Sequence, residues 1–506
     1  MANETNIFAE LIAHCKEYGY IFQSSEIYDG LSAVYDYGQN GAQLKKNLRD
    51  YWWKSMTQLN DNIVGIDAAI FMHPTTWKAS GHVDNFSDPM IDNKDSNKRY
   101  RVDHLIEGFT DDMKNAAIAK FKTGDTESAI QDPLWKQAEI ILLDMDTLLA
   151  KDDFAGLKTL IYDNKIKCAI SKTCNWTEVR QFNLMFSTEF GAVAADNPED
   201  NKVYLRPETA QGIFVNFLNV QKSGRMKIPF GIAQTGKAFR NEIVARQFIF
   251  RMREFEQMEM QYFIRPGSQM QWFTYWKEER KKWHESLGIP AEKLRFHNHV
   301  KLAHYADAAL DIEFEFPFGW KELEGIHSRT NFDLMQHQNF SKKKIQYFDN
   351  DLNEDGKPIG NYTPYVVETS VGLDRLFLTI MSLAYTQEKW LKEDGTEDSR
   401  VVLKIPAKIA PTKLAILPLV KKDGLPEIAK ALMNDCKSSF MCFYEEKDAI
   451  GKRYRRMDAI GTPFCVTIDH QTKEDGTVTI RNRDTMQQER IALADVKRIV
   501  YEKTVW

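Results

Sequence analysis

The run from Phe230 to Phe263 constrains the fold more than any other part of the chain, because its pattern fits two neighbouring β-strands. Polar and apolar residues alternate from position 255 onward, and successive side chains of a strand point to opposite faces of a sheet. One face carries Phe255, Gln257, Glu259 and Gln261, and the other carries Met258, Met260 and Tyr262. A polar face on a buried strand costs stability unless ligand or partner groups satisfy it. The run therefore predicts a binding surface, and Arg246, Arg251 and Arg253 within it favour phosphate groups as ligands.

Further motifs stand before and after this run. They are YLRPETAQGIFVNF at 204–217, PFGWKELEGIHSRTNFDL at 317–334 and ETSVGLDRLFLTIM at 368–381. The run itself contributes Phe239-Arg240-Asn241-Glu242 and Arg251-Met252-Arg253-Glu254-Phe255. In this order the motifs resemble the class II aminoacyl-tRNA synthetases, and among them the glycyl-tRNA synthetases of the single-chain homodimeric type. One such motif is weak, but four in the order of the family, with a matching C-terminal segment, are specific.

The resemblance implies an α+β fold, in which an antiparallel sheet flanked by helices forms the class II synthetase catalytic core and a C-terminal α/β domain binds the anticodon. It divides the chain into 1–104 and 181–400 for the catalytic core, 105–180 for a helical insertion and 405–506 for the anticodon-binding domain. Beyond Arg400 strand and helix patterns alternate, which predicts a mostly parallel sheet. The insertion has two interpretations: contact with the acceptor stem of tRNA, or a peripheral helical cap.

The segment 41–59 has apolar residues at helical spacing, and 63–71 is typical of a buried strand. The stripe consists of Leu44, Leu48, Tyr51, Trp52 and Met56. By resemblance this helix and strand build a dimer interface, so a homodimer is expected. The stripe by itself is more often a core face than a subunit interface.

Composition and charge restrict the class of protein. The chain has 506 residues, of which 43% are hydrophobic, and this allows two or three domains with cores of their own. Its formal charge of −5 argues against a general nucleic-acid coat, so tRNA must meet local basic patches. The densest such patch is Lys452-Arg453-Tyr454-Arg455-Arg456. By itself it fits RNA contact and a solvated helix face equally well, and its location in the chain favours RNA.

Cysteines and hydropathy point to the cytoplasm. The six cysteines form no disulfide framework, which suits a reducing compartment. No second Cys or His pair at zinc spacing accompanies Cys168 and Cys174, so no structural zinc is expected. The N-terminal residues lack the features of a signal peptide, and no segment approaches the ~18 apolar residues of a membrane span. We therefore expect a cytoplasmic protein without a membrane partner.

The implied reaction is attack of the glycine carboxylate on the α-phosphorus of ATP. This carboxylate is already ionised at neutral pH, so the protein must position the reactants and neutralise charge rather than supply a base. By resemblance the catalytic residues are Arg240, Arg375 and Glu322. Arg240 would hold the α-phosphate, Arg251 and Arg375 the γ-phosphate, and Phe255 would stack on adenine. The implied ATP-binding residues are Arg240, Asn241, Glu242, Phe250, Arg251, Met252, Arg253, Glu254, Phe255, Glu322, Leu323, Gly372, Leu373, Asp374 and Arg375.

The resemblance also implies a metal and a glycine site. Mg²⁺ would bridge the phosphates at Glu322 with Glu242 nearby, because this ion takes one or two carboxylates and otherwise water and phosphate oxygens. Glycine offers only an ammonium, a carboxylate and two hydrogens, so acidic side chains must recognise it. The implied glycine-binding residues are Arg101, Glu208, Phe255, Glu256, Gln257, Met258, Glu259, Glu368, Thr369, Ser370, Val371 and Gly372. The three carboxylates of Glu208, Glu259 and Glu368 would repel one another when no ligand is bound.

Two other functions compete with an enzyme that charges tRNA-Gly with glycine. A non-catalytic synthetase-like paralogue would bind RNA or regulate, but such proteins typically lose an ATP-facing arginine, and Arg240, Arg251 and Arg375 are all present. A synthetase for another small amino acid agrees less well with the RPETAQG and ETSVG segments, which fit glycine best.

Overall fold

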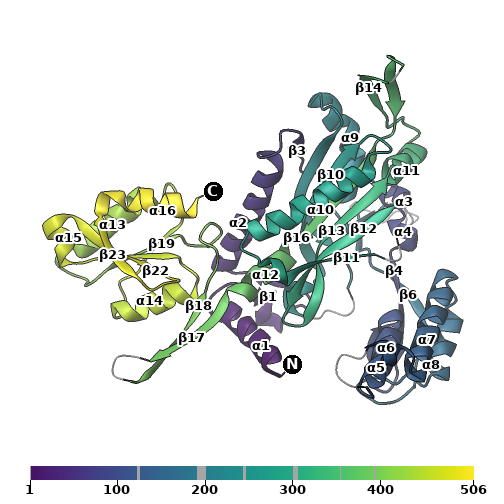
Figure 1. Cartoon of the computed structure of the whole chain (residues 1–506), viewed down its shortest axis with the longest axis horizontal. Helices are drawn as coiled ribbons and strands as arrows, with labels where there is room; N and C mark the ends of the chain where they lie inside the picture. Colours follow the sequence, from purple (N-terminus) through teal and green to yellow (C-terminus); the bar gives the residue numbers. More distant parts are fainter. Residues whose placement is uncertain are drawn as a thin grey trace. The chain divides into compact units, whose positions relative to one another are not determined.

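The computed structural model describes residues 2–121, 126–190, 201–242, 247–299, 302, 306–353, 355–391 and 395–505. They form two compact units (Figure 1). The first unit comprises Met1–Met72, Glu208–Phe239 and Gln247–Trp506, and the second comprises His73–Pro207 and Arg240–Arg246.

A seven-stranded sheet is the centre of the first unit (Figure 1). In spatial order its strands are β11 (Leu294–Asn298), β12 (Ala308–Phe316), β13 (Gly319–Thr330), β16 (Tyr365–Gly372), β10 (Glu254–Ile264), β9 (Phe230–Phe239) and β3 (Ile63–Gly65). Neighbours are antiparallel except β3 and β9, which are parallel. The two strands predicted from the alternation are the adjacent pair β9 and β10, and this prediction is confirmed. The strand predicted for 63–71 is shorter and ends at Gly65, since it lies at the edge of the sheet and pairs on one side.

One face of this sheet is apolar. Met258, Met260 and Tyr262 of β10 are buried on it, which confirms the predicted division of the strand into two faces. Three helices cover this apolar face: α2 (Gln39–Thr57), α10 (Gln269–Ser286) and α12 (Leu373–Ala384). The predicted stripe on α2 therefore packs in the core of its own unit. Gly41 lets α2 approach the preceding chain, because a Cβ there would lie 1.9 Å from the carbonyl oxygen of Tyr20.

The opposite face is apolar at one end and polar at its centre. Helices α9 (Ala210–Ser223) and α11 (Phe332–Ser341) cover the apolar end. There the rings of Phe217 and Phe263 lie 4.6 Å apart, and those of Phe217 and Phe230 lie 5.9 Å apart. We call the remainder, which carries Gln257, Glu259, Gln261, Glu368 and Ser370, the polar face.

Smaller elements surround the sheet. A helix, α1 (Ala2–Glu17), precedes a hairpin of β1 (Ile21–Gln23) and β2 (Tyr35–Tyr37). Two further hairpins are formed by β14 (Tyr347–Leu352) with β15 (Pro358–Tyr362) and by β17 (Tyr385–Leu391) with β18 (Glu397–Leu403). The β17–β18 hairpin leads into the C-terminal domain.

The C-terminal domain has a five-stranded sheet and helices α13 (Leu425–Cys436), α14 (Ile450–Ala459), α15 (His470–Asp475) and α16 (Val496–Thr504). In spatial order the strands are β20 (Cys442–Tyr444), β19 (Leu414–Pro418), β21 (Phe464–Ile468), β22 (Thr477–Asn482) and β23 (Gln488–Ala492). The prediction of a mostly parallel sheet is wrong. Strand β19 is parallel to both neighbours, but β21, β22 and β23 are antiparallel because a short turn joins β22 to β23. The predicted fold class, an antiparallel sheet flanked by helices with a C-terminal α/β domain, is confirmed.

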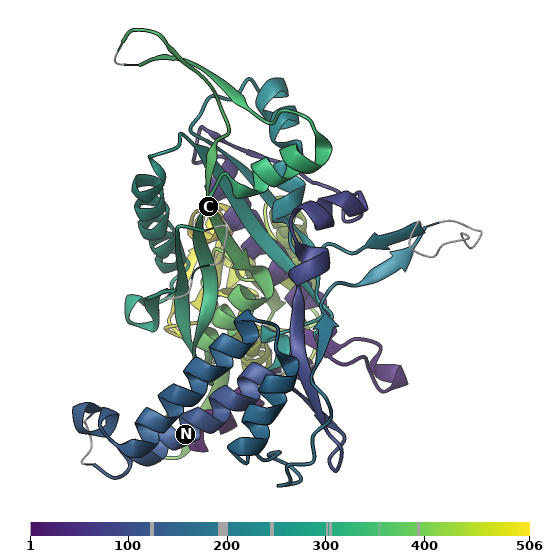
Figure 2. The ribbon, with the colours of Figure 1, turned by 90° about the vertical axis from the view of Figure 1, so that its right-hand side faces the viewer.

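The second unit combines a small sheet with a helical bundle. The sheet is formed by β5 (Lys98–Arg101), β4 (Ser87–Asn93) and β6 (Arg180–Asn183), and a short pair by β7 (Ser187–Glu189) and β8 (Lys202–Tyr204). The helices are α3 (Pro74–Ala79), α4 (His82–Asn85), α5 (Val102–Ile118), α6 (Thr126–Ile130), α7 (Pro133–Ala150) and α8 (Phe154–Asp163). Figure 2 shows α5, α7 and α8 side by side, and Ile106, Ile141 and Leu157 are buried between them. Among the described residues of both units, no helix is long and apolar enough to cross a membrane.

Candidate active site

The polar face brings together acidic and amide side chains from neighbouring strands. In the strand register, Gln261 of β10 lies opposite Glu368 of β16, and Glu368 lies opposite His327 of β13. Glu259 pairs with Ser370 in the same way. Residues directly opposite on adjacent strands share a face, so β10, β13 and β16 each contribute to one cluster.

Two buried carboxyl groups form the centre of this cluster. The amide Nε2 of Gln261 donates to Glu259 Oε1 at 2.7 Å and to Glu368 Oε2 at 2.6 Å. The hydroxyl of Thr209 donates to the other oxygen of Glu259. Glu259 and Glu368 are only 2% and 5% exposed, so their charges must be balanced within the protein or by a ligand.

Their surroundings drive the pKa values of the two carboxyl groups apart. Burial, and then the charges of Glu368 and Glu208, raise the pKa of Glu259 well above its ordinary value. Burial also acts to raise the pKa of Glu368, but Arg329 and His327 outweigh it and hold that pKa below its ordinary value. In the absence of ligand, the surroundings therefore favour the ionised form of Glu368 and the protonated form of Glu259.

A second layer of buried polar groups fixes this arrangement. Arg329 donates to Glu368 Oε2 at 3.1 Å and to both oxygens of Asp333 at 2.9 and 3.0 Å. Gln211 links Asp333 to Glu208, with its Nε2 3.1 Å and 2.9 Å from their carboxylate oxygens. Gln211, Asp333 and Arg329 thus join Glu208 to Glu368, and Gln261 joins Glu368 to Glu259.

Glu259 and Gln257 also contact the start of α9, where the backbone N–H of Thr209 donates to Gln257 Oε1 at 3.2 Å. Gln257 Nε2 lies 3.5 Å from Ser370 Oγ. The predicted residues Gln257 and Ser370 therefore lie beside the two carboxyl groups, and Phe255 occupies the same face of β10 two residues earlier.

A second group of predicted residues meets where β16 ends and α12 begins. Arg375 pairs with the Glu322 carboxylate at 2.8 Å, and its guanidinium lies 4.4 Å from the centre of the Phe250 ring. Gly372 is the N-cap of α12, and a Cβ there would contact the Arg375 side chain at 3.6 Å. Glu322, Phe250 and Arg375 come from distant parts of the sequence, so their meeting agrees with one ATP site.

The remaining predicted residues of the 250–255 segment lie around η3 (Phe248–Phe250) and the start of β10. Arg251 is half-buried and forms no hydrogen bond or ion pair in the described part of the chain. Arg253 contacts the carbonyl of Ser32 at 3.3 Å, and Glu254 pairs with Lys237 at 2.7 Å. Met252 is buried in the main core. Of these side chains, that of Arg251 is the best placed to accept an anion.

Several predicted residues direct their side chains away from the polar face. Four of them alternate with the polar-face residues along β10 and β16 and are buried on the apolar side: Glu256, Met258, Thr369 and Val371. Three more are buried on that side: Leu323, Leu373 and Asp374. Glu256 pairs with Arg49 at 2.8 Å, and Asp374 pairs with Lys45 at 2.7 Å. Any part that these residues take in binding glycine or ATP would rest on their backbone groups.

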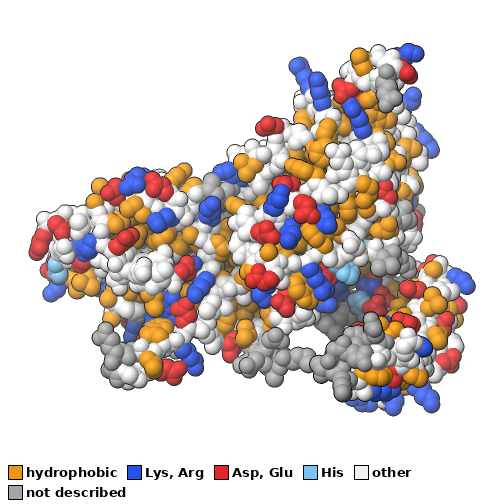
Figure 3. All heavy atoms as spheres, viewed as in Figure 1, with side chains coloured by type: hydrophobic (Ala, Val, Ile, Leu, Met, Phe, Trp, Pro, Cys, Tyr) orange, Lys and Arg blue, Asp and Glu red, His pale blue; other side chains and the backbone are white. Residues whose placement is uncertain are grey.

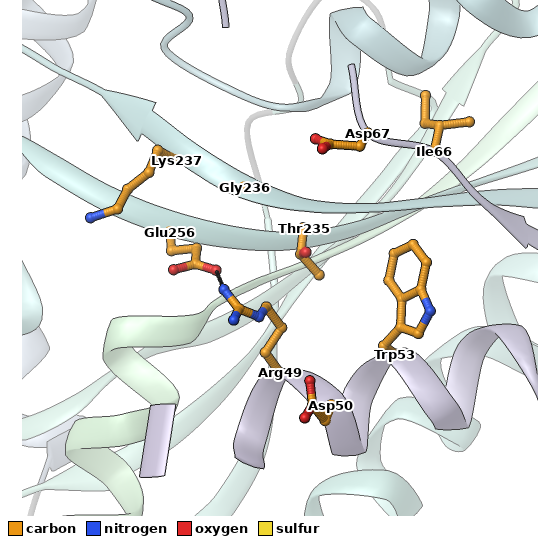
Figure 4. Close-up of a pocket in the computed structure, with 9 residues that line it drawn as sticks. All are labelled: Arg49, Asp50, Trp53, Ile66, Asp67, Thr235, Gly236, Lys237 and Glu256. Atoms are coloured by element: carbon orange, nitrogen blue, oxygen red, sulfur yellow. Dashed lines mark hydrogen bonds and ion pairs between the residues drawn. The ribbon is translucent and has the colours of Figure 1, made fainter. Parts of the chain in front are cut away.

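A hollow of about 500 Å³ lies on this apolar side, and Figure 4 shows the residues that line it. It is lined by Arg49 and Trp53 of α2 and by Thr235 and Lys237 of β9. Apart from Glu256, none of the predicted site residues lines it. The hollow and the carboxylate cluster thus lie on opposite faces of the sheet.

Four predicted residues belong to the second unit. Arg101 is held by Asp103, with Nε 2.8 Å from a carboxylate oxygen, and by Asp88 at 3.2 Å. Arg240 donates to the Pro207 carbonyl at 3.1 Å and lies over the Phe86 ring. Asn241 and Glu242 follow it directly, and the backbone N–H of Asn241 donates to Leu184. Arg246 lies outside the described residues.

The basic run 452–456 is used largely within the C-terminal domain. Arg453 is 1% exposed and donates to the carbonyl oxygens of Pro418 and Leu419 at 2.7 and 3.2 Å. Arg455 pairs with Asp398 at 2.8 Å. Arg456 pairs with Asp448 at 2.7 Å. On the face in Figure 3, charges of both signs are interspersed over this domain, at the left. These three arginines therefore stabilise the fold, and RNA contact by the run stays a prediction.

Four residues of the cluster were not predicted as site residues from the sequence: Gln261, His327, Arg329 and Asp333. All four stand within or next to the recognised motifs, and Gln261 already belonged to the predicted polar face. Their meeting depends on the register of β10, β13 and β16, which no local pattern reveals.

Known proteins resemble the chain over nearly its whole length. Residues 88–184 match the family described as glycyl-tRNA synthetase insertion domain 1, and residues 413–503 match the anticodon binding domain. A protein named glycine–tRNA ligase from Chlorobaculum tepidum is 51% identical over 500 residues, which is 98% of this chain and 99% of that protein. Proteins of the same name from Treponema denticola and Staphylococcus aureus are each 46% identical, over 95% and 98% of this chain and 94% and 98% of their own lengths.

An antiparallel catalytic sheet followed by an anticodon-binding domain defines an aminoacyl-tRNA ligase with class II architecture. The full-length relatives settle the family within that class. The chain belongs to the glycine–tRNA ligase family.

Proposed function

We propose that this chain activates glycine with ATP to form glycyl-adenylate and pyrophosphate, and then transfers the glycyl group to the 3′ end of tRNA-Gly. The observation that carries the proposal is the order of groups along β16 and α12. Glu368 and Ser370 stand on the polar face, Gly372 ends the strand, and Arg375 follows in the first turn of the helix. At about 3.3 Å per residue, the strand from Glu368 to Gly372 spans roughly 13 Å, a length that suits an amino acid joined to a nucleotide.

The amino acid would bind at the carboxylate cluster. Glu259 and Glu368 would receive the ammonium group, with Glu208, Gln257 and Ser370 beside them. Arg101 would sit near the substrate. A buried ionised carboxylate favours a cation, and the absence of a large side chain on glycine lets the ammonium reach both carboxyl groups.

ATP would bind where Arg375, Phe250 and Glu322 meet. Arg240 would hold the α-phosphate and the attacking carboxylate, since the planar guanidinium matches two oxygens at once. Arg251 and Arg375 would neutralise the γ-phosphate, and Phe255 would stack on adenine. These side chains lower the barrier by holding the reactants in line and balancing the charge that shifts onto pyrophosphate.

The residues present fit a magnesium ion. Glu322 carries a half-exposed carboxylate, and its charge, after burial, helps to raise the pKa of Asp311 on the neighbouring strand. Two carboxylates close enough to repel each other suit a divalent cation, which needs few protein ligands when it also binds phosphate. Glu322 would hold this ion, with Glu242 as the further predicted ligand, and the ion would supply charge neutralisation on the phosphates.

We also propose a cytoplasmic homodimer with three parts. The catalytic core would comprise 1–104 and 181–400, the helical insertion 105–180, and the anticodon-binding domain 405–506. The match of 413–503 to an anticodon binding domain supports the last assignment, and the match of 88–184 supports an insertion in the middle of the chain.

The test is exchange of labelled pyrophosphate into ATP. We expect exchange with glycine but not with alanine or serine, and Arg240→Ala should lower it by at least about two orders of magnitude, the usual effect of removing a preorganised charge. Arg498→Ala is a matched control, because Arg498 is exposed on α16 and pairs only with neighbouring acidic residues of its own helix end. Exchange stimulated equally by alanine would overturn the substrate assignment, and no exchange at all would favour the non-catalytic paralogue.

A further inference from the structure

One histidine stands directly beside the ionised carboxylate of the cluster. His327 Nδ1 donates to Glu368 Oε1 at 2.8 Å, and the two residues are opposite each other on β13 and β16. The imidazole side chain is 20% exposed, whereas that of Glu368 is 6% exposed. The histidine therefore lies between the buried carboxylate and the more open part of the polar face.

The hydrogen bonds of Glu368 divide unequally between its two oxygens. Oε2 accepts from both Gln261 and Arg329. In the part of the chain that the structure describes, Oε1 accepts a side-chain N–H from His327 alone. Two donors on one oxygen hold that oxygen in place, but they leave the carboxylate free to turn about it. The bond from His327 fixes the second oxygen and hence the plane of the group.

Space for the imidazole ring comes from a glycine on the same strand. Gly325 and His327 share a face of β13, and a Cβ at position 325 would lie 2.9 Å from Cε1 of the ring. Real Cβ atoms do not approach so closely, so any larger residue at 325 would push the ring away from Glu368. Gly325 does not have a positive φ, and its backbone conformation suits any residue. The absence of a side chain there serves the position of the ring.

Neighbouring charged groups hold the ring from the other strands. His299, which directly follows β11, lies beside it with ring centres 5.9 Å apart and ring planes tilted by 60°, and His299 Nε2 lies 2.9 Å from Asp311. Burial acts to lower the pKa of His327, but the bond to Glu368 and its charge outweigh burial and raise that pKa. The imidazole thus gains positive charge beside Glu368 and strengthens the bond between them.

We propose that His327 is a positioning residue for glycine, which orients the Glu368 carboxylate toward the substrate ammonium in the space that Gly325 leaves open. This inference rests on the proposed function, because it assumes that Glu368 binds the ammonium group. His327 would act through Glu368 and would not itself touch the phosphates of ATP.

The test compares Michaelis constants for the two substrates in pyrophosphate exchange by the full chain. We expect His327→Ala to raise the KM for glycine by roughly tenfold or more, the effect of losing one hydrogen bond to a charged group, and to leave the KM for ATP unchanged. His327→Asn should recover part of the loss, since its amide nitrogen can occupy the place of Nδ1. Gly325→Ala should raise the KM for glycine in the same way by displacing the ring.

The double variant sharpens the test. If Gly325→Ala acts by moving the ring, adding it to His327→Ala should cause no further rise in the KM for glycine. Matched controls are His470→Ala and Gly451→Ala in the C-terminal domain, where His470 is exposed and a Cβ at 451 meets nothing within 4 Å. Both controls should leave both constants unchanged.

The outcomes separate this inference from the proposed function. Wild-type protein without glycine-dependent exchange would refute the proposed function itself. With active wild type, an unchanged KM for glycine in His327→Ala and Gly325→Ala would refute the positioning role. Equal rises in the KM for glycine and for ATP would also refute it, because they would indicate a general distortion of the sheet. If His327→Ala does not fold, His327→Asn and Gly325→Ala decide the question alone.

Discussion

Replacing Glu259 by glutamine should make the protein without ligand more stable and bind glycine less well. The Glu259 side chain is fully enclosed between Thr209, Gln261 and Glu368, and burial together with the neighbouring carboxylates raises its pKa well above the ordinary value. The empty site therefore favours the neutral, protonated form of this carboxyl group. A substrate ammonium would favour the ionised form, so glycine binding should expel that proton.

The sign of the effect on stability follows from the raised pKa. A group whose pKa is raised by folding stabilises the folded state fully below its unfolded pKa, and this contribution is lost as pH rises through the folded pKa. The loss for Glu259 thus begins near the ordinary pKa of a glutamate and continues as pH rises through the raised pKa of the folded state. Glutamine does not titrate, and the Thr209 hydroxyl can rotate to accept from its amide. The stability gain of Glu259→Gln should be small at acid pH and grow as pH rises.

The size of the effect on binding follows from the lost charge. A hydrogen bond to a charged group contributes about 1.5–3 kcal/mol, which corresponds to a rise of roughly 10-fold to 150-fold in the KM for glycine. The KM for ATP should stay unchanged, since Arg375 and Glu322 form a separate group of contacts.

Thermal unfolding from pH 5 to 9, together with glycine-dependent exchange, measures both effects. Glu292→Gln is the matched control, because Glu292 is exposed and lies outside the carboxylate cluster. The reasoning fails if Glu259→Gln keeps the glycine KM of the wild type, or if its stability changes with pH in parallel with the wild type.

Two further predictions concern the C-terminal domain. Asp458 is fully buried and pairs with Arg400 at 2.8 Å and Arg481 at 2.8 Å, so Asp458→Ala should lower the free energy of unfolding by about 3–5 kcal/mol in urea denaturation. The more exposed Asp398→Ala should cost less than about 1 kcal/mol, and equal losses would contradict the role of burial. Truncation after Pro411 should preserve glycine-dependent exchange and abolish charging of tRNA, as measured with purified tRNA. A cut before Ile405 should abolish both, because Ile405, Ile409 and Ala410 pack in the main core.

Local pattern sufficed for several features of the fold. The alternation in β10 gave two faces of opposite character, and the helical spacing of Leu44, Leu48 and Trp52 placed α2 correctly. These predictions succeed because each depends on a repeat along one element, with a period of two in strands and 3.6 in helices. The four motifs gave the family for a similar reason, since each is a short contiguous run.

Other features depend on which distant residues meet. Glu256 and Glu259 look alike in the sequence, yet one faces α2 and the other faces Glu368. Arg453 looks like an exposed cation, but its guanidinium is buried against carbonyl groups of the loop after β19. Ile405, Ile409 and Ala410 fall within the range expected for the anticodon-binding domain, yet they pack in the main core.

The sequence by itself determined the strand pair β9 and β10, the family and the residue types of the candidate site. The tertiary structure alone decided that Gln261 bridges two carboxyl groups. It also decided that Arg329 and His327 lower the pKa of Glu368, while burial and neighbouring carboxylates raise that of Glu259. The physical reason is that charge states depend on burial and on neighbours within a few ångströms. Those neighbours lie up to 159 positions apart in the chain, as Thr209 and Glu368 do, and the register of β10, β13 and β16 brings them together.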